Sequence, residues 1–207
     1  MPNRTLTVLF SCILFTSFAI AGGQEIPAKN CAYDRARMLA LDENQFDQDM
    51  SGGWRALSST PGCELAAADL LRDYREAHGD DWGLLYWHEA QLRAFVGQYE
   101  EAIALMKHSY MPADKADWNA YVDATIAFLR KDSDALQQAK VKLAAFPAPP
   151  KDANMPPIVN GYMEVKLADG TARKMRWPPN IDVVEGLQKC FDIPYVEAYK
   201  EACRRKN

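Results

Sequence analysis

Apolar residues recur at every third or fourth position through most of residues 31–146, the pattern of amphipathic helices. The clearest helix is expected over 64–78, where the positions available for burial are Leu65, Ala68, Leu70, Leu71 and Tyr74. Further helical segments are expected over 31–50, 54–57, 82–96, 99–109, 117–130 and 134–146, with breaks at 51–53 and at Gly97. Asp114 is the candidate cap of the segment that follows it. The pattern therefore predicts a mainly α-helical fold.

The pattern changes at 147–157, where five prolines in eleven residues predict an extended linker. Period-two alternation follows and predicts a β-hairpin over 161–177. A two-residue turn would mix apolar and charged residues on each face. A three-residue loop with a left-handed Gly170 instead pairs Met163 with Met175 and sets Glu164 opposite Lys174. We expect this longer loop, followed by two final helices over about 182–189 and 194–205.

The first residues have the pattern of a targeting signal. An apolar run of 16 residues, from Leu6 to Ala21, follows Arg4 and ends in the small-x-small pattern Ala19-Ile20-Ala21. A membrane anchor is the alternative, but the run is shorter than the roughly 20 residues that span a bilayer. We expect residues 1–21 to be a cleaved signal peptide. The mature chain is then periplasmic or secreted and has no membrane span.

Four cysteines remain after such a cleavage, namely Cys31, Cys63, Cys190 and Cys203. An even number in an exported chain favours disulfides. Three connectivities are possible, and pairing of chain neighbours is favoured, which gives Cys31–Cys63 and Cys190–Cys203. The second bridge requires Cys190 and Phe191 to leave the preceding helix, because the two Cα atoms would otherwise lie too far apart.

Residues 84–146 resemble the tetratricopeptide repeat, a helix-turn-helix unit of about 34 residues. The first unit places Ala90, Gly97, Tyr99 and Ala102 at motif positions, and Ala90 recurs 34 residues later as Ala124. The second unit departs from the motif, since a basic residue stands at its turn. The expected organisation is a signal peptide over 1–21, a helical repeat-like domain over 22–146 and the linker over 147–157. A β-hairpin and two helices over 158–207 pack on the helical domain.

The resemblance also implies a concave wall, formed by the first helix of each unit. The positions carried over to this wall are Leu84, Trp87, Gln91, Phe95, Trp118, Tyr121, Thr125 and Phe128. Aromatic side chains that flank polar ones suit peptide binding. The alternative is that the C-terminal hairpin and helices fold over this wall and fill it.

Candidate catalytic and metal motifs are incomplete. The stretch "HEAQL" has Leu92 where a zinc helix needs its second histidine. The stretch "DQDMSGG" begins like a calcium loop at Asp47, but Ser58 stands where a bidentate glutamate is needed. No serine or thiol has an evident neighbouring base. We expect no metal, no cofactor and no catalytic residues.

Charge excludes one class of partner. The chain has 24 basic and 28 acidic residues, and its one run of basic residues is 204–206 at the end. Nucleic-acid binding needs a basic stripe with aromatic residues, so we do not expect it. The expected function is a non-enzymatic scaffold that binds a protein or peptide in the cell envelope. The alternatives are an inhibitor or immunity-type protein that blocks a secreted enzyme, and an envelope hydrolase with a carboxylate site.

Overall fold

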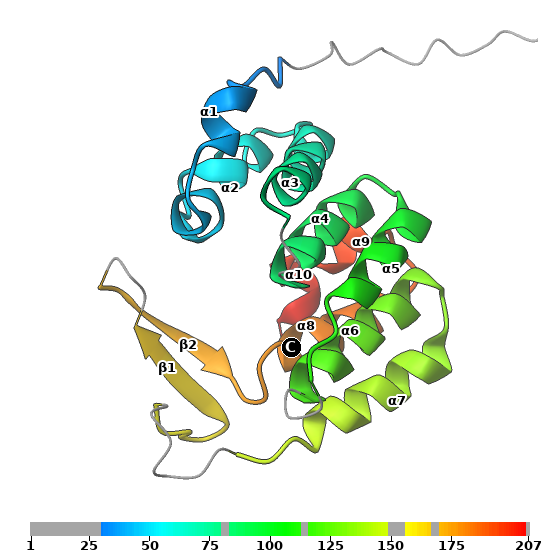
Figure 1. The fold of residues 1–207 in the computed structure, drawn as a ribbon. Helices are drawn as coiled ribbons and strands as arrows, with labels where there is room; N and C mark the ends of the chain where they lie inside the picture. The colour runs from blue at the N-terminus through cyan, green and yellow to red at the C-terminus, as the bar shows by residue number, and fades with distance from the viewer. Residues whose placement is uncertain (1–29, 80–82, 113–115, 149–155, 167–169, 206–207) are drawn as a thin grey trace, which may run out of the picture.

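The computed structural model describes residues 30–79, 83–112, 116–148, 156–166 and 170–205. The fold is mainly helical and carries one two-stranded antiparallel hairpin, followed by short helices, as the sequence predicts (Figure 1). The expected signal peptide, the cap Asp114 and most of the proline-rich linker lie outside the described residues. Within the described residues, no helix combines the length and apolar character needed to cross a membrane.

The helices up to residue 144 follow one another along a curve, the last three helices return to pack against the central ones, and the hairpin projects from one side (Figure 1). The N-terminal helices are α1 (Arg35–Leu39), the π-helical turn η1 (Asn44–Gln48), α2 (Gly53–Ser58) and α3 (Glu64–His78). The central helices are α4 (Gly83–Phe95), α5 (Tyr99–His108), α6 (Ala116–Leu129) and α7 (Ser133–Ala144). The C-terminal part comprises β1 (Tyr162–Lys166), β2 (Ala172–Arg176), α8 (Ile181–Lys189), α9 (Tyr195–Ala198) and α10 (Glu201–Arg204).

Two hydrophobic cores meet at α4. The first core lies under the N-terminal helices and contains Phe46, Leu70 and Leu71, to which α4 adds Leu85 and Leu92. The second core lies among α4–α9 and receives Trp87, Ala90 and Ala94 from the same helix. The apolar residues of α4 therefore lie on two sides of the helix, one packed in each core, and this helix joins the two halves of the molecule.

Two antiparallel helix pairs, α4–α5 and α6–α7, occupy the region that resembles the tetratricopeptide repeat. Ala90, Ala102 and Ala124 are fully buried within it. Small residues at these positions let packed helices approach closely, since a larger side chain would have to displace its neighbours. The repeat type itself stays a prediction, because helix pairs of this kind also occur in ordinary bundles.

The hairpin has the predicted register. Met163 lies opposite Met175 and Glu164 lies opposite Lys174. Met163 is buried, and Met175 is half-buried on the same face. A slip of one residue would turn these apolar side chains outward, so the buried face selects the register.

Both predicted disulfides are present. Cys31–Cys63 and Cys190–Cys203 have Cα–Cα distances of 5.5 and 6.0 Å. Cys190 has left the helix, with φ −111° and ψ 40°, as its bridge requires. The prediction of one continuous helix over 194–205 is wrong. Lys200 is extended, with φ −68° and ψ 156°, and the break separates α9 from α10 so that α10 can pack on α8 beside the bridge.

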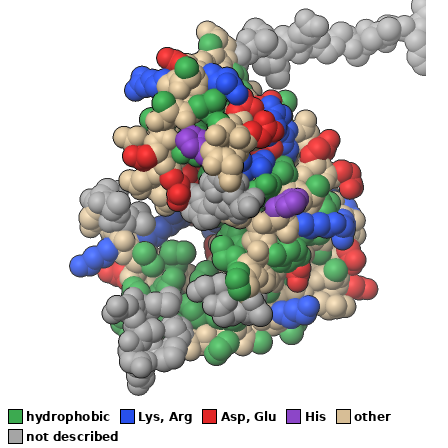
Figure 2. Space-filling model, viewed as in Figure 1, with side chains coloured by type: hydrophobic (Ala, Val, Ile, Leu, Met, Phe, Trp, Pro, Cys, Tyr) green, Lys and Arg blue, Asp and Glu red, His purple; other side chains and the backbone are tan. Residues whose placement is uncertain are grey.

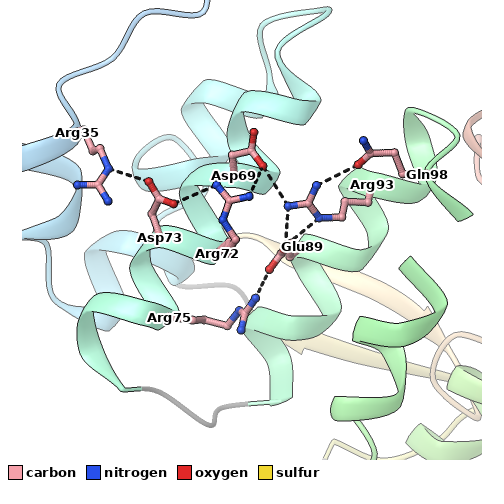
Figure 3. A network of polar contacts seen from close by, with 8 residues as sticks. All are labelled: Arg35, Asp69, Arg72, Asp73, Arg75, Glu89, Arg93 and Gln98. Atoms are coloured by element: carbon pink, nitrogen blue, oxygen red, sulfur yellow. Dashed lines mark hydrogen bonds and ion pairs between the residues drawn. The ribbon is translucent and has the colours of Figure 1, made fainter. Parts of the chain in front are cut away.

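A buried carboxylate ties α3 to α4 (Figure 3). Glu89 on α4 is 2% exposed, and its two carboxylate oxygens accept hydrogen bonds from Arg75 and Arg93. Arg93 also donates to Asp69 at 3.0 Å, and the Arg75 guanidinium lies 3.8 Å from the centre of the Tyr86 ring. Because a buried charge is tolerated only when it is paired and hydrogen-bonded, this network fixes how α4 faces α3.

Replacement of Glu89 should therefore be costly. We expect Glu89→Ala to lower the free energy of unfolding by about 3–5 kcal/mol, because it leaves two arginines buried without their shared partner. Urea unfolding at neutral pH measures this loss. The control is Arg72→Ala in the same network, whose side chain is 43% exposed and whose loss should cost less than about 1 kcal/mol. Equal losses in the two variants would contradict the central role of Glu89.

Candidate functional site

A fully buried aspartate organises the N-terminal half of the site. Asp47 lies in the π-helical turn η1 and is 0% exposed. One carboxylate oxygen accepts a hydrogen bond from Trp54 Nε1 at 2.8 Å and lies 2.7 Å from His88 Nδ1. The other oxygen accepts from Gln48 Nε2 at 2.6 Å. The carboxylate thus joins η1, α2 and α4, which are up to 41 residues apart in sequence.

A glycine makes this arrangement possible. Gly53 starts α2 with φ +50°, a left-handed conformation that side chains other than hydrogen disfavour. A Cβ atom at this position would lie 1.9 Å from the carbonyl oxygen of Phe46. The backbone can therefore pass close behind η1, which brings the next residue, Trp54, to Asp47. Arg55 follows, and its Nε donates to the Asp47 carbonyl oxygen at 2.7 Å.

The Asp47 carboxylate is ionised at neutral pH. Burial by itself would raise its pKa, but the hydrogen bonds from His88 and Trp54 and the positive charge of Arg55 outweigh burial and hold the pKa below the usual value. An ionised carboxylate only accepts hydrogen bonds, so Nδ1 of His88 carries the hydrogen. The Trp54 indole lies beside this imidazole, with ring centroids 5.0 Å apart.

His88 and Trp54 form part of the wall of a cavity of about 500 Å³, which we call the α4 cavity. Its walls come from α2, the start of α3, one side of α4 and the segment α9–α10. Its lining is largely apolar, and charged side chains also contribute to it. The lining residues are Trp54, Ser58, Glu64, His88, Gln91, Leu92, Phe95, Val196, Tyr199, Lys200 and Arg204.

The C-terminal helices close one side of the α4 cavity. Gln91 Nε2 donates to the Tyr199 hydroxyl at 3.1 Å. The Phe95 ring packs against Tyr195 and Tyr199, with centroid distances of 5.5 Å in both cases. These contacts join α4 to α9 across more than 90 residues of sequence, so the cavity exists only after the chain end has docked.

The eight predicted wall residues do not form one open groove. Gln91 and Phe95 line the α4 cavity. Trp87, Tyr121, Thr125 and Phe128 are buried, while Leu84 and Trp118 are half-buried against the same core.

The reason is the C-terminal segment. Tyr195 of α9 is fully buried, and its ring lies 5.5 Å from that of Phe95 and 5.9 Å from that of Phe128. Trp118 turns its indole Nε1 to the Ser109 carbonyl oxygen at 2.7 Å. The C-terminal segment therefore fills most of the wall, which is the alternative to an open peptide-binding wall. The six buried or half-buried positions are core residues in this arrangement.

Asp47, Trp54 and Arg55 were not predicted as site residues from the sequence. In the sequence, Asp47 resembles only the start of a calcium loop and His88 only half of a zinc motif. In the structure the Asp47 oxygens bind side-chain N–H groups of the protein. Among the described residues, no group of three or more His, Cys, Asp or Glu side chains could hold a metal ion. The one local sequence feature that could have indicated this site is the pair Gly52-Gly53, which stands between Asp47 and the dipeptide Trp54-Arg55.

Comparisons with known proteins add no assignment. No protein-family model, curated protein or solved structure matches this chain. The function must therefore be argued from the geometry of the α4 cavity.

The close backbone approach at Gly53 can be tested with two alanine substitutions. Gly53→Ala should lower the free energy of unfolding by about 1–3 kcal/mol more than Gly79→Ala does, because its Cβ overlaps the Phe46 backbone. Gly79 also has a left-handed φ, +59°, but a Cβ there would meet no atom within 4 Å. The difference between the two urea midpoints isolates the overlap, and equal midpoints would show that η1 moves aside freely.

The charge of Asp47 predicts a pH dependence. Its folded pKa lies below the ordinary 3.8, so its contribution to stability is complete above that value and is lost as the pH falls through the folded pKa. We expect Asp47→Asn to be less stable than the wild type by about 1–3 kcal/mol at neutral pH. Urea unfolding at decreasing pH should show this gap narrowing below pH 3.8. A gap that stays constant into acid would mean that the charge does not matter.

Proposed function

We propose that this protein is an exported, non-enzymatic scaffold that binds a protein or peptide partner in the cell envelope, and that the α4 cavity is its binding site. The observation that carries the proposal is the cavity itself. Its volume of about 500 Å³ lies within the range of small-ligand sites, roughly 300–1,000 Å³. A mainly apolar lining with a few polar groups suits an anchor side chain that a partner inserts into it.

The rigidity of the cavity supports binding. The Cys190–Cys203 bridge holds α10 against α8, and the Gln91–Tyr199 hydrogen bond holds α9 against α4. A site that is already formed costs little conformational entropy when a partner enters it. The two disulfides also suit the oxidising compartment that the expected signal peptide implies.

The resemblance to tetratricopeptide repeats supports the same class of function. In our proposal, α4–α7 act as a helical scaffold. The partner binds at the α4 cavity and not at the wall that the resemblance predicts, because that wall is filled. An inhibitor or immunity-type protein would use the same cavity to hold a secreted enzyme. The choice between these two binding roles depends on the partner.

One observation favours the hydrolase as a second candidate. His88 lines the α4 cavity, and the buried Asp47 carboxylate lies 2.7 Å from its Nδ1, the arrangement in which a carboxylate orients a general base. Ser58 lines the same cavity, but its hydroxyl donates to the Arg55 carbonyl oxygen at 3.0 Å. We therefore rank binding first.

A charge placed in the cavity should abolish partner binding. Val196 lines the α4 cavity, and Val196→Asp should weaken binding by at least about tenfold, because the partner must bury a carboxylate. The control is Val141→Asp on α7, where Val141 is 56% exposed and outside the cavity. Each protein is immobilised, exposed to envelope extract and compared for the partner it retains, after circular dichroism has verified its helical content.

The scaffold proposal expects a partner on the wild type and on Val141→Asp that is lost on Val196→Asp. Equal retention of the partner by all three proteins would show that the partner binds outside the α4 cavity. Failure of the wild type to retain any partner, together with turnover of chromogenic esters or glycosides that His88→Ala abolishes, would favour the hydrolase instead.

A further inference from the structure

A second cavity adjoins the α4 cavity. It has a volume of about 550 Å³ and lies between β2 of the hairpin and the helices α8 and α10; we call it the hairpin cavity. Tyr199 and Arg204 line both cavities, so the two cavities adjoin at these side chains. The space-filling view shows a hollow between the hairpin and the helical body, with hydrophobic side chains around it (Figure 2). An extended ligand that passes Tyr199 and Arg204 would reach both cavities.

The lining of the hairpin cavity is strongly basic. Its basic side chains are the five residues Arg173, Lys174, Arg176, Arg204 and Arg205, against two acidic ones, Asp182 and Glu201. The chain as a whole has a formal net charge of −4, so positive charge is concentrated here against the overall balance. The linear sequence hides this feature, because the hairpin and α10 contribute its parts from segments about 30 residues apart.

Internal ion pairs leave part of this positive charge available. Arg176 is held by Glu185 through two hydrogen bonds, and Arg205 pairs with Glu201 at 3.3 Å. Arg204 lies 3.7 Å from Asp182, a loose pair, and its side chain is 27% exposed. A carboxylate from a ligand would give this side chain a closer, charge-assisted partner than Asp182 does.

We propose that the ligand is an acidic peptide segment of the partner, with one large apolar side chain in the α4 cavity and neighbouring carboxylates in the hairpin cavity. This inference rests on the proposed function and specifies its ligand. The apolar lining formed by Leu92, Phe95 and Val196 selects the anchor. The basic lining of the hairpin cavity selects carboxylates of the ligand. Tyr199 and Arg204, which lie between the two cavities, set the spacing between the apolar anchor and these carboxylates.

A peptide fits these cavities better than a nucleic acid does. Asp182 and Glu201 are interspersed with the basic residues, and Glu64 lines the far cavity. A continuous phosphate backbone would meet these carboxylates at close range, and like charges disfavour binding. The carboxylates of a peptide are spaced along its chain, so they can contact the basic residues and still avoid Asp182, Glu201 and Glu64.

A displayed library of random nine-residue peptides, selected on the immobilised full-length mature protein, tests the inference. We expect the selected peptides to combine a leucine, methionine or aromatic residue with two or more glutamates or aspartates. A synthetic peptide of the enriched sequence is then measured by fluorescence anisotropy. Replacing its acidic residues by the corresponding amides, or its anchor by glycine, should each weaken binding by about tenfold or more. Affinity should also fall as salt is raised, because the charges are partly exposed.

Two charge reversals locate the site on the protein. Arg173 is exposed on β2 and lines the hairpin cavity, so Arg173→Glu should weaken binding of the synthetic peptide by about three- to tenfold. Lys142→Glu on α7 changes the net charge equally at an exposed position outside both cavities and should leave binding unchanged. Equal weakening by both variants would indicate a general charge effect and overturn the inference.

The other outcomes separate this inference from the proposed function. Enrichment of apolar peptides without acidic residues, still blocked by Val196→Asp, would overturn the acidic ligand and leave the scaffold function standing. A single-stranded oligonucleotide that displaces the peptide and binds with similar affinity would also overturn it, in favour of a polyanion. An absence of any enrichment would overturn the inference. The proposed function would fall as well only if the wild type also retained no partner from envelope extract.

Discussion

The buried Glu89 carboxylate is the constraint on which the rest of the structure depends. It lies between two arginines at the interface of α3 and α4. Because its charge must stay paired, α4 has few alternative orientations on α3. The residues immediately beside it on α4 are His88 and Ala90, one in the α4 cavity and the other in the second core. A rotation of α4 would therefore break the ion pairs, open both cores and dismantle the cavity together.

The same helix explains why the molecule has a cavity where it does. α4 packs on α3 with one side and on the second core with another, which leaves His88 and Gln91 along a third strip, bordered by the core residues Leu92 and Phe95. The C-terminal segment covers only part of this strip, because Tyr195 enters the core and Tyr199 stops at Gln91. The space between Tyr199 and α2 remains as the α4 cavity, with Asp47 behind its histidine. The cavity that we propose as the binding site thus results from incomplete coverage of α4 and is held in place by a disulfide and a hydrogen bond.

Local chemistry was sufficient to predict much of the fold. The apolar period gave α3 its bounds at Glu64–His78, and the need to keep Met163 and Met175 on one face determined the hairpin register. Neighbour pairing gave both disulfides, including the departure of Cys190 from its helix. The single C-terminal helix was predicted wrongly, because the break at Lys200 serves packing of α10 on α8 and has no strong signal in the local sequence.

The candidate site was largely beyond such reasoning. Helical periodicity marks which residues of α4 are apolar, but it does not say which neighbour each of them meets; Trp87 and Phe128 were expected to face a groove and instead lie in the core. The contacts that decide this join Asp47 to His88 and Phe95 to Tyr195, over 41 and 100 residues of chain respectively. The sequence by itself determined the helices, the hairpin and the bridges, since each depends on periodicity, turn geometry or spacing along the chain. Only the tertiary structure decided where the cavities lie and which charges line them, because those depend on how far the docked C-terminal segment reaches across α4.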